Sequence, residues 1–351
     1  MAKKADSKHV LVIRLSAMGD VAMTVPALMA LLRKYPEAKI TLLTKPHFEP
    51  IFNKIERVTV FPVHVKSYHK GIWGLWKLYT ELKAFTFTHI ADLHNVLRSK
   101  ILCSFFGLSN LPINKVDKGR GAKRMLVRNK NKIFKPLKST IERYVSVFND
   151  LGFEINLGKN DFLPKEALPQ ELKKYGGPDN NKTIGIAPFA TYHSKMYRLD
   201  LMEKVIKQLI SKKNHKVLLF GGGKEESKQL KTLDSRFGDE VQSVAGELRF
   251  EEELALISNL DVMLAMDSGN GHLAANYAVP VVTLWGVTHP YAGFKPYNQP
   301  LENSLVPDRD IFPLIPTSIY GNKYPEGYLE AINTITPEKV ARKVMEILDK
   351  A

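Results

Sequence analysis

The chain has 351 residues, a net charge of +15 and one cysteine. This length is enough for two domains, each with its own core. The longest apolar runs are far shorter than the ~18 residues that a membrane span needs, and the first residues do not form an apolar signal segment, so we expect a cytoplasmic protein. Because Cys103 is alone, an intrachain disulfide and a cysteine metal cluster are excluded, which fits a reducing compartment.

The positive charge is distributed unevenly along the chain. Residues 115–138 carry ten lysines and arginines against one aspartate. A basic excess favours an anionic partner, which can be nucleic acid, an anionic membrane surface or a phosphorylated substrate. A charge run is also typical of a solvated loop, so the segment indicates where an electrostatic role would lie without identifying the partner.

Short apolar runs alternate with amphipathic stretches along the first half of the chain. The first strand is predicted at residues 9–16, and the turn Ala17-Met18-Gly19-Asp20 leads into a helix that ends near Tyr35. This alternation predicts a parallel, doubly wound sheet. Further strands are predicted at residues 39–44, 58–63 and 89–93, and further helices at residues 72–83 and 139–152.

A stretch without periodicity separates this half from a second alternation. It is rich in proline and glycine and predicts an interdomain linker at residues 161–181. Two Rossmann-like domains, residues 1–160 and 182–335, are therefore expected rather than one large sheet, followed by a helix at residues 336–351 that opens with Thr336-Pro337-Glu338. Strands of the second half are predicted at residues 183–187, 216–220, 262–266 and 281–285, and helices at residues 199–212, 225–237, 250–259 and 272–278.

Asp267, Ser268 and Gly269 stand between a predicted strand and a predicted helix. In an open parallel sheet ligands collect at this position, because free backbone N–H groups and the helix dipole both favour an anion. The same residue types also form an ordinary helix N-cap. The spacing alone leaves both interpretations open.

Two other strand ends carry candidate side chains. Asp20 follows the first strand, where a carboxylate suits an N-cap and also a general base that faces a cleft. Gly221-Gly222-Gly223 follows the strand at residues 216–220, but its spacing does not fit the dinucleotide fingerprint, so a nicotinamide-dependent dehydrogenase is disfavoured. Glu225 or Glu226 either binds the hydroxyls of a ribose or simply occupies the first helical turn.

Four short motifs resemble those of glycosyltransferase family 9, the ADP-heptose:lipopolysaccharide heptosyltransferases. Residues 14–21 (RLSAMGDV) are similar to the amino-terminal signature of that family, and residues 267–275 (DSGNGHLAA) are similar to its donor-site motif. Ala187-Pro188-Phe189 with Lys195-Met196-Tyr197, and Asp92-Leu93-His94-Asn95 with Arg98-Ser99, resemble two further motifs. The resemblance therefore spans nearly the whole chain.

The resemblance implies a GT-B architecture, with two Rossmann-like, doubly wound parallel-sheet domains and a central cleft. The first domain would bind the acceptor, the second the nucleotide-sugar donor, and the last helix would cross back to the first domain. The implied enzyme, of EC class 2.4, is inverting and uses neither metal nor other cofactor. It moves a heptose from ADP-heptose to the acidic, lipid-linked inner core of lipopolysaccharide. We expect a monomer that associates peripherally with the cytoplasmic face of the inner membrane.

The resemblance also implies roles for single residues. Asp20 is the candidate base, with Asp92 as an alternative, and Lys195 is expected to face the leaving ADP. His272 would donate to the same phosphate, and Asp267 would hold the donor sugar or brace the turn. The expected donor-side residues are Ala187, Pro188, Phe189, Lys195, Glu225, Glu226, Asp267, Ser268, Gly269 and His272, and the expected acceptor-side residues are Gly19, Asp92, Asn95, Arg98, Arg120, Lys123 and Arg124.

Some alternatives stay open at this point. Tyr197 stands where the family usually has tryptophan, and Asn270-Gly271 replaces a commoner apolar pair, so another nucleotide-sugar or another glycan acceptor is possible. A basic nucleic-acid-binding protein is the alternative from another class, but residues 115–138 lack interleaved aromatic side chains, and we expect no nucleic-acid partner. A catalytically silent family member would be expected to lack the carboxylate at position 20.

Overall fold

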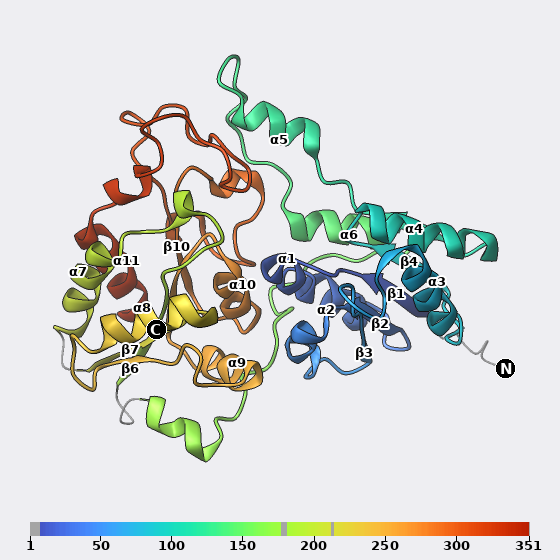
Figure 1. Cartoon of the computed structure of the whole chain (residues 1–351), viewed down its shortest axis with the longest axis horizontal. Coiled ribbons are helices and arrows are strands. Elements are labelled where there is room, and N and C mark those ends of the chain that lie inside the picture. Colours follow the sequence, from blue (N-terminus) through green and yellow to red (C-terminus); the bar gives the residue numbers. More distant parts are fainter. Residues whose placement is uncertain (1–7, 177–180, 212–213, 351) are drawn as a thin grey trace. The chain divides into compact units, whose positions relative to one another are not determined.

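The computed structural model describes residues 8–176, 181–211 and 214–350, which form two compact units. Unit 1 holds the chain up to Lys118 together with Thr140–Leu163, and unit 2 holds Gly119–Ser139 and the chain from Pro164 onward (Figure 1). Residues 1–7 of the predicted first domain, 177–180 of the predicted linker, 212 of a predicted helix and 351 lie outside the described residues. None of the described helices has the length and apolar character that crossing a membrane requires.

Unit 1 contains a five-stranded parallel sheet in the order β3-β2-β1-β4-β5. The chain starts in the middle and winds first to one side and then to the other, so the sheet is doubly wound. Ile13 pairs with Asp92, which aligns the carboxyl ends of β1 and β4. The strands are β1 (His9–Ile13), β2 (Lys39–Thr44), β3 (Val58–Pro62), β4 (His89–Asp92) and β5 (Ile113–Lys115).

Helices cover this sheet because alternate residues of each strand point to opposite faces and both sets are apolar. Leu11 and Ile13 of β1 join one core cluster with Leu78 of α3 and Leu102 of α4, and Val10 and Val12 are equally buried. The helices are α1 (Met18–Ala22), α2 (Val25–Lys34), which packs on α6 (Thr140–Asp150), and α3 (Gly71–Leu82), which packs on α4 (Leu97–Phe106).

Unit 2 contains a six-stranded parallel sheet in the order β11-β10-β9-β6-β7-β8. Its winding reverses between β6 and β9, where Ala187 pairs with Ala265. Two doubly wound parallel-sheet units confirm the predicted fold class. The strands are β6 (Lys182–Ala187), β7 (His215–Leu219), β8 (Val241–Ser243), β9 (Val262–Met266), β10 (Val281–Leu284) and β11 (Ser304–Leu305).

The helices of unit 2 include the last helix of the chain, α11. Thr336 caps it by accepting a hydrogen bond from the N–H of Lys339. The resemblance implies that this helix crosses back to the first domain. Its apolar residues, such as Val340 and Val344, are buried in the core of unit 2, where α11 packs on α7 and β9. The helices are α7 (Leu199–Ile210), α8 (Gly223–Asp234), α9 (Phe250–Ser258), α10 (Gly269–Asn276) and α11 (Pro337–Leu348).

Residues 119–139, here called the basic arm, are inserted between β5 and α6 but cluster with unit 2. The arm contains α5 (Arg120–Val127). Lys132 donates hydrogen bonds to the carbonyls of Leu314 and Pro316, the second at 2.7 Å. The guanidinium of Arg309 lies 3.7 Å from the ring centroid of Phe134. The arm therefore packs as part of unit 2, although it lies inside the predicted first domain.

Some elements differ from the predicted ones. The single helix expected up to Tyr35 is divided into α1 and α2, because Pro26 is tolerated only in the first turn of a helix. Helix α10 begins at Gly269, three residues before the predicted start. Helices α4 and α5 and strands β5, β8 and β11 were not predicted. Short 3-10 helices occur at Pro46–Phe52, Gly107–Ser109, Gln170–Tyr175, His193–Lys195, Pro290–Ala292, Leu301–Asn303 and Ala331–Thr334.

Candidate active site

Each sheet reverses its winding at one place, and the predicted site residues follow the strands at these places. In unit 1, Arg14 and Asp20 follow β1, and Asp92 ends β4. In unit 2, Lys195 follows β6 and Asp267 follows β9. Ligands of open α/β sheets bind outside the carboxyl ends of the strands at such a switch point. Each unit therefore contains one candidate half-site.

Asp20 lies in the first turn of α1, next to Gly19. Its Oδ2 atom is 2.5 Å from a guanidinium nitrogen of Arg14, and the Asp20 side chain is 30% exposed while that of Arg14 is 8% exposed. Arg14 also donates to the carbonyl of Leu93 at 2.7 Å, which fixes the guanidinium. Burial raises the pKa of Tyr144, so its phenol stays protonated and donates to the main-chain carbonyl of Asp20 at 3.2 Å. The carboxylate is thus held in place while part of it stays accessible.

Asp92 is 1% exposed and braces the loop after β4. Its Oδ1 atom accepts hydrogen bonds from the N–H groups of His94 and Asn95 at 2.9 and 2.8 Å, and Oδ2 accepts from the hydroxyl of Ser99 at 2.8 Å. Asn95 donates its side-chain amide to the carbonyl of Val116 at 2.7 Å. These contacts use both carboxylate oxygens within the loop, which favours a structural role for Asp92 over that of a base.

His94 lies among four cations at the carboxyl edge of the unit 1 sheet. It is 8% exposed, and burial, followed by the charges of Arg14, Lys118, Arg98 and Lys45, lowers its pKa to about 3. The imidazole is therefore neutral near pH 7. Its buried Nδ1 atom has no hydrogen-bond partner among the described residues. Cations gathered at one edge of a sheet favour the binding of an anion there.

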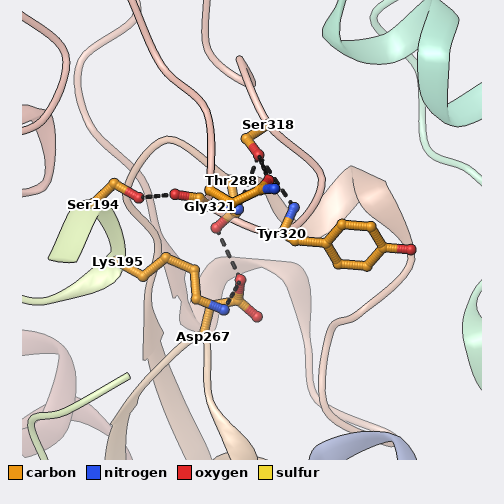
Figure 2. Close-up of polar contacts among 8 residues, drawn as sticks. Ser194, Lys195, Asp267, Thr288, Ser318, Tyr320 and Gly321 are labelled. Carbon is orange, nitrogen blue, oxygen red and sulfur yellow. Dashed lines mark hydrogen bonds and ion pairs between the residues drawn. The ribbon is translucent and has the colours of Figure 1, made fainter. Parts of the chain in front are cut away.

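In unit 2 a largely buried ion pair joins the segments that follow two adjacent strands, β6 and β9. The Nζ atom of Lys195 lies 3.1 Å from Oδ2 of Asp267, and the two side chains are 12% and 8% exposed. The hydroxyl of Thr288, beyond β10, donates to the same oxygen at 2.9 Å. Figure 2 shows Lys195 and Thr288 reaching the carboxylate from separate segments. Oδ2 of Asp267 is therefore held by two donors, the ammonium of Lys195 and the hydroxyl of Thr288.

The segment that carries Lys195 is fixed by close main-chain packing. The hydroxyl of Ser194 donates to the carbonyl of Gly321 at 2.5 Å (Figure 2). A Cβ atom on Gly286 would lie 1.9 Å from the carbonyl oxygen of Ser194, so only glycine fits there. The hydroxyl of Ser318 accepts from the N–H of Gly321 at 2.9 Å. These contacts position the Lys195 backbone.

The amino terminus of α10 lies directly beyond Asp267. Ser268 is the N-cap residue, but its side chain makes no cap hydrogen bond. Its buried Oγ atom has no hydrogen-bond partner within the part of the chain that the structure describes. Gly269 begins the helix and His272, one turn further, is 6% exposed. A helix amino terminus with a hydroxyl still able to bond is suited to an anion such as a diphosphate.

The other donor-side candidates lie at neighbouring strand ends. Ala187 and Pro188 are buried at the end of β6, and Phe189 packs against the core. Glu226 accepts a hydrogen bond from the N–H of Gly222 at 2.8 Å, so it caps its own helix. Glu225 is exposed and lines an open groove between α7 and α8. For Glu226 this hydrogen bond favours the second of the two interpretations, that the residue simply occupies the first turn of its helix.

Three expected acceptor-side cations lie on the basic arm. Arg120 and Arg124 are exposed. Lys123 is 8% exposed, and its Nζ atom lies 4.2 Å from the ring centroid of Phe294 in unit 2. The structure thus groups these three residues with unit 2, whereas Arg98 belongs to unit 1 beside His94.

Several residues of the half-sites had no assigned role in the sequence. Arg14 and His94 lie within the quoted motifs, and their positions at strand ends would have been a signal. Thr288 follows β10, the strand next to β9, so the carboxyl-end rule could have identified it. Ser194 and Gly286 act through backbone contacts, for which the sequence carries no comparable signal.

Comparisons with known proteins agree with this geometry. The model of the family described as "Glycosyltransferase family 9 (heptosyltransferase)" matches residues 75–310, two thirds of the chain. Lipopolysaccharide heptosyltransferase 2 of Salmonella typhimurium is 25% identical, over 97% of this chain and 99% of that protein.

Two solved structures are also similar. A family 9 glycosyl transferase from Veillonella parvula has a TM-score of 0.76 at 18% identity and covers all of both chains. The E. coli heptosyltransferase WaaC with ADP-2-deoxy-2-fluoro heptose has a TM-score of 0.68 at 18% identity, covering 96% of this chain and 99% of that one. The match to more than half of the chain decides its class: the protein belongs to glycosyltransferase family 9 and is a glycosyltransferase with a GT-B fold.

Proposed function

We propose that this protein transfers a heptose from ADP-heptose to the acidic inner core of lipopolysaccharide. The observation that carries the proposal is the Lys195–Asp267 ion pair beside the amino terminus of α10, together with the N-cap hydroxyl of Ser268, which has no hydrogen-bond partner among the described residues. The names of the relatives support the sugar and the acceptor, and the WaaC structure was solved with an ADP-linked heptose analogue.

The donor side would act on the diphosphate. When the bond between the anomeric carbon and the phosphate oxygen breaks, negative charge builds on the departing ADP. Lys195 and the N–H groups of Ser268 and Gly269 are the groups that would stabilise this charge without a metal. Asp267 would hold the ammonium of Lys195 in place, and His272 would contact the same phosphate.

The acceptor side would supply the base. Asp20 would take the proton of the acceptor hydroxyl while that oxygen attacks the anomeric carbon opposite the leaving ADP, so the configuration of this carbon inverts. Arg14 keeps the carboxylate oriented, and the partial exposure of Asp20 leaves room for a substrate. The cations around His94 would bind the anionic groups of the acceptor.

The proposal extends to the cellular setting. A net charge of +15 suits a monomer that works on a lipid-linked acceptor at the cytoplasmic face of the inner membrane, held there by anionic lipids. The departures at Tyr197 and Asn270-Gly271 leave other family 9 donors and acceptors as the alternative outcome.

Calorimetric titration with ADP, UDP and GDP in EDTA tests the donor assignment. We expect selective ADP binding that weakens in Lys195→Ala and is lost in Ser268→Trp, which fills the helix end. Lys204→Ala, which removes an exposed charge of the same unit, is the matched control and should bind ADP normally. Preference for UDP or GDP, or a need for a divalent cation, would contradict the assignment.

Comparison of two carboxylate variants tests the base. Asp20→Asn should lose about 10² to 10⁴ in turnover with ADP affinity unchanged, the usual range for general-base catalysis. Asp92→Asn should lower stability more than turnover, because it disrupts the loop after β4. The opposite result, with Asp20→Asn active and Asp92→Asn folded but inactive, would move the role to Asp92.

A further inference from the structure

Helices α3 and α4, which pack on each other in unit 1, expose large apolar side chains. On α3, Trp73 is 82% exposed, Ile72 is 51% exposed and Trp76 is 48% exposed, and Leu97 at the start of α4 is 75% exposed. We call these four residues, with Lys70 and Lys77, the α3 face. Single exposed apolar residues are ordinary, but four of them on two packed helices, two of which are tryptophans, mark an interaction surface.

The exposure follows from how α3 packs. Its inner side carries Leu75, Leu78 and Leu82, which belong to the same buried core cluster as side chains of the sheet. Trp73 and Trp76 lie one turn apart on the outer side, and Trp76 meets Phe105 of α4 with ring centroids 5.2 Å apart. The apolar surface therefore continues from α3 onto α4, and the outer side of α3 stays exposed.

The stretch of the chain that carries this face has more cations than acids. From Val63 to Gly107 the chain has six lysines and arginines and only two acids, Glu81 and Asp92. Both acids are engaged: Glu81 lies 3.1 Å from Nε2 of His69, and Asp92 braces its loop. Lys70 and Lys77 are exposed beside the tryptophans. The composition, aromatic and aliphatic side chains with lysines, fits an anionic lipid surface, where tryptophan prefers the interface and lysine meets headgroups.

The position of the α3 face within unit 1 also fits a membrane as the partner. Helices α3 and α4 each connect two strands of the parallel sheet, so each begins on the side of the sheet where the strands have their carboxyl ends. Trp73 and Leu97 in their first turns therefore lie at the edge that carries Arg98 and the His94 cation cluster. A lipid-linked acceptor would reach this edge from a membrane.

We propose that the α3 face docks onto an anionic lipid bilayer and inserts Trp73 and Leu97 at its interface. The inference deepens the proposed function, since it rests on a lipid-linked acceptor for its biological purpose. The binding itself requires no sugar, so its failure is distinguishable from the failure of heptose transfer.

Tryptophan fluorescence provides a direct readout. Only three tryptophans occur in the chain, and the third, Trp285, is fully buried in unit 2. Vesicles of phosphatidylglycerol and phosphatidylethanolamine should shift the emission of Trp73 and Trp76 to shorter wavelength, and lipids brominated in the acyl chain should quench it. A Trp73→Phe/Trp76→Phe variant, with Trp285 as its only fluorophore, should show neither change.

Flotation with the same vesicles measures the binding. Burying a tryptophan or leucine side chain is worth enough free energy that Trp73→Glu and Leu97→Glu should each weaken binding about tenfold or more. Lys70→Gln/Lys77→Gln should weaken binding to anionic vesicles at low salt and leave the small residual binding to phosphatidylcholine unchanged. Ile311→Glu, at a residue of unit 2 that is 62% exposed, is the matched control and should bind like wild type. Circular dichroism confirms that each variant is folded.

Three results would overturn the proposal. The first is equal binding to anionic and phosphatidylcholine vesicles. The second is a folded Trp73→Glu variant that binds anionic vesicles as tightly as wild type. The third is a concentration-dependent dimer, seen by light scattering without lipid and abolished by Trp73→Glu, which would make the face a contact between two copies of the chain.

Discussion

Replacing Lys195 by methionine removes one charge of the buried pair while keeping most of the side-chain volume. At 3.1 Å and an effective dielectric constant of ~20, the attraction between the two charges is about 5 kcal/mol. Removing one partner of a buried pair typically costs about 3–5 kcal/mol, because the other charge stays buried and unpaired. The Thr288 hydroxyl still bonds to Asp267 and offsets about 1 kcal/mol. We therefore expect Lys195→Met to lower the free energy of unfolding of unit 2 by about 3 kcal/mol.

Urea unfolding measures this cost, with Trp285 as the probe of unit 2. The Trp73→Phe/Trp76→Phe background removes the signal of unit 1, so that the fluorescence transition belongs to one unit. The double variant Lys195→Met/Asp267→Asn removes both charges and should recover most of the loss. A loss below about 1 kcal/mol in Lys195→Met, or a double variant less stable than the single one, would refute the reasoning that the pair is buried and mutually dependent.

Three further predictions concern backbone packing, pH and the basic arm. Gly286→Ala should lower the melting temperature of unit 2, because its Cβ would collide with the Ser194 carbonyl, whereas Gly222→Ala, with open space around it, should not. The folded state keeps His94 neutral down to a pKa of about 3, whereas the unfolded chain binds a proton on this residue near pH 6.5. The free energy of unfolding should therefore fall by about 1.4 kcal/mol for each pH unit below 6.5. In urea titrations His94→Asn should lose this part of the pH dependence, and an unchanged slope would contradict the prediction. Lys132→Met should leave the carbonyls of Leu314 and Pro316 unsatisfied and speed hydrogen exchange in residues 120–127, and unaltered exchange would show that Lys132 does not anchor the arm.

The central strands of both sheets were predictable because their physical signal is local. β1, β2 and β9 are short runs of mainly apolar residues that are almost entirely buried, as expected for strands covered on both faces. β5, β8 and β11 have three residues or fewer and form through pairing with a neighbour, so their sequences carry little signal.

Two helices show where sequence patterns mislead. α5 lies within the strongly basic segment at residues 115–138, which resembles a solvated loop; its order comes from packing on unit 2. Gly269 and Gly271 of α10 are typical of a turn, but Gly271 packs close to β9 and β10, where a Cβ would meet side chains at 3.4 Å and 3.5 Å. Tertiary packing therefore overrides local propensity at both places.

The candidate site was predictable in its residues but not in its contacts. Lys195 and Asp267 were expected on the donor side, yet their ion pair joins positions 72 residues apart. Asp92 and Asn95 were predicted to lie on the side that binds the sugar acceptor. Their hydrogen bonds are made within unit 1, which the spacing of residues in the sequence could not have shown. The assignment of residues 119–139 to unit 2 likewise depends on long-range contacts such as that of Lys132.

The most direct test of the account is the transfer reaction itself. Purified protein is incubated in EDTA with ADP-heptose and an acidic inner-core lipid A acceptor, and mass spectrometry and NMR identify the product. We expect the acceptor to gain one heptosyl residue with inverted anomeric configuration, and Asp20→Asn to form it at a rate lower by about 10² to 10⁴. Transfer only from another nucleotide-sugar, retention of configuration, or full activity of Asp20→Asn would contradict the account.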